Sequence, residues 1–94
     1  MKTNVTFRHF KTHPELHSAA LDAADNFVKF HDQIISTDIV FKDDNVKTVE
    51  FTVHVQGNTL VAKESSDDFN KSLNDAADKI VRQLRKWKTK RFEV

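Results

Sequence analysis

Seven basic residues lie close together near the end of this 94-residue chain, between Lys79 and Arg91, and no acidic residue separates them. Lysines and arginines at this density can neutralise the phosphates of a nucleic acid, because each contact releases a counterion from the polyanion. Such contacts position a protein on RNA more than they read its sequence. The segment therefore predicts a surface for RNA or another polyanion, formed by Lys79, Arg82, Arg85, Lys86, Lys88, Lys90 and Arg91.

One amphipathic helix, from residue 65 to residue 91, is expected to carry this basic cluster. Apolar residues recur in it at steps of three and four, the pattern of a helix with one buried face: Phe69, Leu73, Ala76, Ile80, Leu84 and Trp87. Two serines and two aspartates at its start can accept hydrogen bonds from the first free backbone N–H groups. We expect Trp87 to pack against a sheet, with stacking on a base as the alternative.

The simplest alternative to a binding surface is a solvated helix face. Acids early in a helix and bases late in it match the helix dipole, so part of the charge order stabilises the helix itself. A solvated face would also pair acids with bases four residues apart, whereas no acid occurs between Lys79 and Arg91. The basic residues instead form one stripe away from the apolar positions, which favours binding: Lys79, Arg82, Lys86 and Lys90.

Charge is divided unevenly along the chain. The net charge is +1, yet the remainder of the chain holds eight basic residues against fourteen acidic ones. This asymmetry indicates a polyanion at one end and argues against a protein that coats nucleic acid with its whole surface. The length suits a single domain, cysteine is absent, and no apolar run reaches the length of a signal peptide or a membrane span. We expect a soluble cytoplasmic protein.

Enzyme chemistry finds little support in the sequence. A single glycine argues against a phosphate-cradling loop, and no nucleophile motif is present. His9, His13 and His17 are spaced by four, but the first precedes the expected helix start, and two imidazoles without a third ligand make a poor metal site. We therefore expect no enzymatic activity, no metal, no cofactor and no small-molecule substrate.

The remaining elements are expected to place the basic helix on a sheet. Residues 1–10 alternate as a strand, and Thr12 with Glu15 forms a capping box for a helix that reaches about residue 31. Residues 35–42 form a second strand, with Ile35, Thr37, Ile39 and Phe41 on one face. Residues 47–56 and 59–64 form a hairpin around Gly57-Asn58. The order β-α-β-β-β-α predicts an α+β two-layer sandwich, a four-stranded sheet with two helices packed on one face.

Several of these segments together resemble a known family, the short ribosome hibernation-promoting factors, also called ribosome-associated inhibitor or sigma-54 modulation proteins. The similarity rests on the hairpin that contains His54-Val55-Gln56-Gly57, on Asp67-Asp68 before an aromatic residue, and on the run Asp78-Lys79-x-x-Arg82-Gln83-Leu84-x-Lys86-x-Lys88. It spans the whole chain in element order and is most specific in the second half. Members are similar in having the β-α-β-β-β-α fold derived above.

What the resemblance implies is binding to ribosomal RNA, and to neighbouring ribosomal proteins, in the channel of the small subunit that messenger RNA and tRNA occupy. Occupancy would inhibit translation during stress or stationary phase. By position, Lys79, Arg82, Lys86, Lys88 and Lys90 resemble the family's RNA contacts, and Gln83 resembles a polar contact. Ala23 and Asn26 stand where members usually carry lysines on the first helix, leaving Lys29. We expect one ribosome-binding domain over 1–94 without a C-terminal dimerisation domain, monomeric off the ribosome.

Two rival functions remain open at this point. A double-stranded RNA binder also ends in a β-β-β-α segment, although the acidic turn at Asp43-Asp44 suits it badly. A protein–protein adaptor of the sigma-54 modulation type would use the uncovered sheet face or an edge strand. The sequence is also compatible with two outcomes on the ribosome, idle monomers or paired ribosomes. In the family that the chain resembles, a longer tail opposes pairing, so the resemblance implies that the short tail after residue 91 belongs to the kind that permits pairing.

Overall fold

The structure is a computed structural model that describes the backbone of residues 1–31 and 33–92, with the side chains of these residues as far as Lys86. The elements follow the predicted order: β1 (Lys2–Arg8), α1 (Pro14–Val28), β2 (Ile34–Asp44), β3 (Val46–Val55), β4 (Asn58–Ser66) and α2 (Phe69–Phe92).

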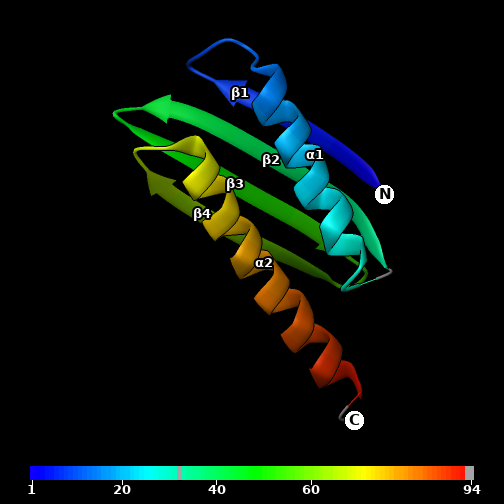
Figure 1. Cartoon of the computed structure of the whole chain (residues 1–94). Helices are drawn as coiled ribbons and strands as arrows, with labels where there is room; N and C mark the ends of the chain where they lie inside the picture. Colours follow the sequence, from blue (N-terminus) through cyan, green and yellow to red (C-terminus); the bar gives the residue numbers. More distant parts are fainter. Residues whose placement is uncertain (32, 93–94) are drawn as a thin grey trace.

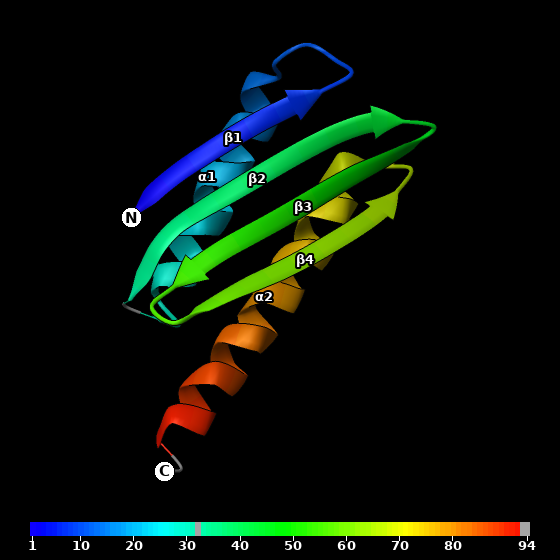
Figure 2. The ribbon, with the colours of Figure 1, turned by 180° about the vertical axis from the view of Figure 1, so that it is seen from behind.

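The four strands form one sheet in the order β1-β2-β3-β4. Strands β1 and β2 are parallel, and α1 is the crossover that parallel pairing requires; the other two pairs are antiparallel. Both helices cover the same face of the sheet (Figure 1), and the opposite face is uncovered (Figure 2). The predicted two-layer α+β sandwich is therefore confirmed.

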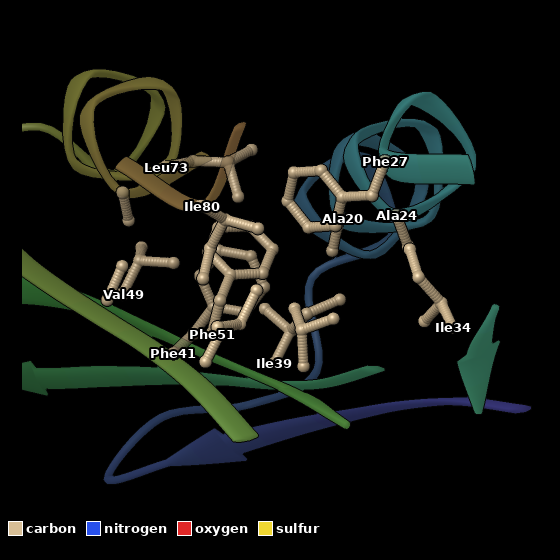
Figure 3. Close-up of a cluster of buried hydrophobic side chains, with 14 of the residues drawn as sticks. Ala20, Ala24, Phe27, Ile34, Ile39, Phe41, Val49, Phe51, Leu73 and Ile80 are labelled. Carbon is tan, nitrogen blue, oxygen red and sulfur yellow. The ribbon is translucent and has the colours of Figure 1, made fainter. Parts of the chain in front are cut away.

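The core lies between the sheet and the two helices. Alternate residues of β2 and β3 point toward the helices, where Ile39, Phe41 and Phe51 are fully buried (Figure 3). Phe27 of α1 meets Phe51 edge to face, with 5.3 Å between the ring centroids. Ile80 of α2 is fully buried in the same cluster. Since each fully buried side chain of this size contributes about 1.5–3 kcal/mol, the cluster fixes both helices on the sheet.

The predicted alternation fails at the start of β2. Ile34 is buried and Ile35 is 59% exposed, so Ile35 does not share a face with Thr37, Ile39 and Phe41. The cause is a register shift against β3 between Ile34 and Ser36. An extra residue at such a bulge moves the side chains on one side of it to the other face of the sheet.

The predicted start and end of the first helix are also wrong. His13, not Thr12, is the N-cap, and its Nδ1 atom accepts a hydrogen bond from the Leu16 backbone N–H at 3.3 Å. Pro14 then occupies the first helical position, where its missing N–H costs nothing, and this preference moves the cap by one residue. The helix ends at Val28 rather than near His31.

Three of the described residues, all between elements, have left-handed backbone conformations: His9, Asn45 and Gly57. Val55 pairs with Asn58, so the tight connection of this hairpin is Gln56-Gly57, one residue earlier than predicted. Gly57 has φ 84°, which glycine adopts without a Cβ penalty. His9, directly after β1, has φ 70°, which costs a residue with a Cβ about 1–2 kcal/mol.

Candidate nucleic-acid interface

Helix α2 carries the predicted basic cluster beyond the end of the sheet. The Asp68 side chain accepts from the Asn70 backbone N–H at 3.2 Å and caps the start of the helix, as predicted. The predicted start at residue 65 is wrong, because Ser65 and Ser66 are the last residues of β4 and the helix begins at Phe69. From there the predicted apolar stripe is buried as far as Leu84, and includes Phe69, Leu73, Ala76 and Ile80. Figures 1 and 2 both show the helix continuing past the hairpin of β3 and β4. The last turns therefore stand away from the sheet.

The structure places the predicted binding residues along this helix in different surroundings. Lys79, Arg82 and Lys86 are exposed. Gln83 is half-buried, and Arg85 is exposed but packed on a neighbour. The side chains of Lys88, Lys90, Arg91 and Trp87 lie outside the described residues, so only their place on the α2 backbone is given.

Gln83 bonds to the protein itself. Its Nε2 atom donates to the backbone carbonyl of Val61 at 3.0 Å. Val61 lies on β4, the edge strand of the sheet, so this bond ties α2 to a strand that has no further strand beside it. The bond also occupies one main-chain acceptor of this edge strand, and unpaired acceptors at an edge can pair with other chains. Gln83 thus has a structural partner that the resemblance did not indicate.

Arg85 joins the two helices. Its guanidinium carbon lies 5.1 Å from the centroid of the Phe30 ring, within the range of a cation–π contact. Phe30 follows the C-cap of α1, where Lys29 is exposed. The contact brings the end of α1, with its remaining lysine, next to the basic part of α2.

Lys79 forms an ion pair that its spacing in the helix did not reveal. Its partner is Glu64, on the helix-facing side of β4, whose side chain is only 26% exposed. Asp75, Asp78 and Arg82 line the same cavity of about 190 Å³. The spacing of acids and bases within α2 does not indicate this pair, because Glu64 lies on β4, fifteen residues before Lys79 in the sequence.

The uncovered sheet face carries a polar row across all four strands. Asn4 donates to Asp38 at 2.9 Å, His54 Nε2 lies 3.5 Å from Asp38, and His54 Nδ1 lies 3.4 Å from the Thr59 hydroxyl. An Asp–His–hydroxyl order is also found in nucleophilic enzymes. Here both histidine distances are long for hydrogen bonds and the groups are about 40% exposed to water. The row is a surface network, and strand register, invisible in the sequence, assembles it.

The described residues show two further features that bear on the candidate functions. No group of three His, Asp or Glu side chains within them is arranged to hold a metal ion. No helix within the described part of the chain has the length and apolarity to span a membrane.

Comparisons with known proteins agree with one another. A family model described as "Sigma 54 modulation protein / S30EA ribosomal protein" matches residues 3–91. The chain is 26% identical over 91 residues to the ribosome hibernation promoting factor of Pseudomonas putida, covering 96% of this chain and 89% of the relative. A ribosomal subunit interface protein from Coxiella burnetii is similar in structure, with TM-score 0.87, 26% identity and coverage of 95% and 99% of the two chains. The N-terminal domain of Thermus thermophilus Protein Y, at 14% identity, shares the fold with TM-score 0.85, over 93% of this chain and 99% of that domain.

Proposed function

The chain belongs to the family of sigma 54 modulation proteins and S30EA ribosomal proteins, and on this premise we propose that it binds the small ribosomal subunit and holds the ribosome idle. The names of its relatives, a ribosome hibernation promoting factor and a ribosomal subunit interface protein, support a ribosome-associated role. The family is not known as one of enzymes, so the proposal contains no catalytic step. Such a factor would act in the cytoplasm, where small subunits are.

The observation that carries the proposal is the projecting basic end of α2. Seven basic residues between Lys79 and Arg91 lie on a helix whose buried stripe is anchored as far as Leu84. The sheet and its core hold this helix in one orientation, so little conformational entropy is lost when RNA binds. Exposed Arg82 and Lys86 neutralise phosphates, and Lys88, Lys90 and Arg91 extend the same surface in this proposal.

Inhibition is steric in this proposal. The two-layer body fills the channel that messenger RNA and tRNA would occupy, while the basic end of α2 contacts the ribosomal RNA that lines it. The remainder of the chain, with eight basic residues against fourteen acidic ones, repels RNA elsewhere and limits loose binding. Affinity therefore comes from one end of the molecule and selectivity from the shape of the channel.

Cosedimentation with purified small subunits tests this function. We expect saturable, near-stoichiometric binding that weakens with salt, with a log–log slope of about 0.7–0.9 for each phosphate neutralised. The slope counts the phosphates contacted, because each contact releases condensed counterions. A salt series at constant magnesium gives this slope while the subunits stay intact.

Naked duplex RNA at equal phosphate concentration is the control. Much weaker binding to the duplex supports recognition of the subunit. Equal binding to both would make the protein a general double-stranded RNA binder. If the chain binds neither the subunit nor the duplex, the proposal is contradicted. That result would favour the protein–protein adaptor function, in which the chain associates with proteins in a concentration-dependent way and does not bind RNA.

A further inference from the structure

The first basic residue of the predicted surface, Lys79, already has an anionic partner. Its Nζ atom is paired with a carboxylate oxygen of Glu64. Strand β4 holds the backbone of Glu64 in place through its pairing with Val49 of β3. The Glu64 side chain is 26% exposed, so the helix and the strand enclose most of it. The carboxylate therefore has few other positions available to it.

The surroundings of this pair are acidic. Three carboxylates and two cations line one cavity: Glu64, Asp75, Asp78, Lys79 and Arg82. A phosphate that approached Lys79 would meet this excess of negative charge at short range. Toward the C-terminus of α2 the balance changes, since no acid follows Asp78 before the helix ends. Near Lys79, carboxylates of the protein itself neutralise the basic side chains of α2. Within about two turns toward the C-terminus, the charged residues of the helix are all basic.

We propose that Glu64 limits the affinity of this protein for ribosomal RNA by occupying Lys79 in competition with phosphate. This inference rests on the proposed function and assigns Glu64 the role of an affinity-determining residue that does not itself contact RNA. Lys79 is 52% exposed, so it could reach a phosphate once released from Glu64. The phosphate-binding surface of the native protein then lacks one of the cations that the sequence offers.

A purely structural role for the pair fits the contacts less well. Surface ion pairs with one partner in water add little to stability, because solvent screens them and ordering the lysine costs entropy. The Gln83–Val61 hydrogen bond and the buried stripe already fix α2 on β4. Removing the Glu64 charge should therefore change RNA affinity while leaving the melting temperature nearly unchanged.

Glu64→Gln tests the inference in cosedimentation with purified small subunits. Freeing one cation adds about 0.7–0.9 to the log–log salt slope. Counterion release contributes nothing to the affinity at 1 M salt, so the two proteins are compared from that point. Over the tenfold decrease in salt to about 0.1 M, the added slope makes the variant bind about five- to eightfold more tightly than the wild-type chain. The matched control is Glu50→Gln, which makes the same change of charge on the uncovered face of the sheet, opposite Lys63. We expect it to leave the slope unchanged.

A double-variant cycle with Lys79→Gln separates competition from direct repulsion. If Glu64 acts by occupying Lys79, Glu64→Gln has no effect in the Lys79→Gln background. An equal gain of affinity in both backgrounds would mean that Glu64 repels RNA directly, and would overturn the inference. It is also overturned if Glu64→Gln matches the Glu50→Gln control while the wild-type chain binds normally. Failure of the wild-type chain to bind subunits overturns the proposed function and this inference together.

Discussion

Replacing Arg82 and Lys86 together by glutamate is expected to lower the affinity for the small subunit by at least about 25- to 60-fold at about 0.1 M salt. Both side chains are exposed on consecutive turns of α2, so in the proposed complex both would face the RNA. Losing two phosphate contacts reduces the log–log salt slope by about 1.4–1.8, and the fold-change follows from that slope. Repulsion by the two new carboxylates adds to the loss. Cosedimentation across a salt series measures both quantities.

The matched control for this variant reverses the same number of charges elsewhere. Lys2 and Lys63 are exposed on β1 and β4, on the face of the sheet opposite the one that α2 covers, and their replacement by glutamate changes the net charge equally. At about 0.1 M salt the screening length is about 10 Å, so this distant change should cost little. Equal losses in the two double variants would show that only total charge matters. If the folded Arg82→Glu/Lys86→Glu variant binds subunits as well as the wild-type chain, α2 does not contact the RNA and the proposed interface is wrong.

Replacing Phe51 by alanine should have the largest effect on stability, lowering the free energy of unfolding by about 3–5 kcal/mol. Phe51 is fully buried and its ring packs edge to face on Phe27, so the change leaves a cavity between the sheet and α1. A chain of this length has about 5–14 kcal/mol of stability in total. The variant therefore loses a large part of it, and urea unfolding followed by circular dichroism measures the loss.

Val61→Ala is the control for this core substitution. Val61 is 51% exposed on the uncovered face of the sheet, so its truncation should change stability by less than about 0.5 kcal/mol. A similarly small change for Phe51→Ala would contradict the assignment of Phe51 to the core. Because both variants keep the charge of α2, any folded fraction should still bind subunits.

The sequence predicts the fold well wherever a local pattern decides the structure. Val49, Phe51, Val53 and Val55 alternate in the sequence and are buried in the sheet, since a period of two admits only one buried face. The alternation misleads at Ile35, because a register shift depends on the partner strand. His13 replaces the expected cap because two neighbouring residues could both start the helix, and the position of Pro14 decides between them.

The surroundings of the candidate binding residues are less predictable than the fold, for a physical reason. The charge run on α2 is visible in the sequence, but the partners of individual side chains depend on tertiary packing. Glu64 reaches Lys79 from β4, and Gln83 bonds to the backbone of Val61. The Asp38–His54 contact likewise requires the register of β2 against β3. Pairs between elements leave no spacing signal in a single chain.

The most direct test of the central claim is competition with messenger RNA and tRNA on the small subunit. Subunits are loaded with a short messenger RNA and a P-site tRNA, and binding of the chain is compared with its binding to empty subunits at the same salt concentration. Mutually exclusive binding, with tRNA released as the chain saturates the subunit, is the predicted result. Equal binding to loaded and empty subunits would place the chain outside the channel and contradict the steric mechanism.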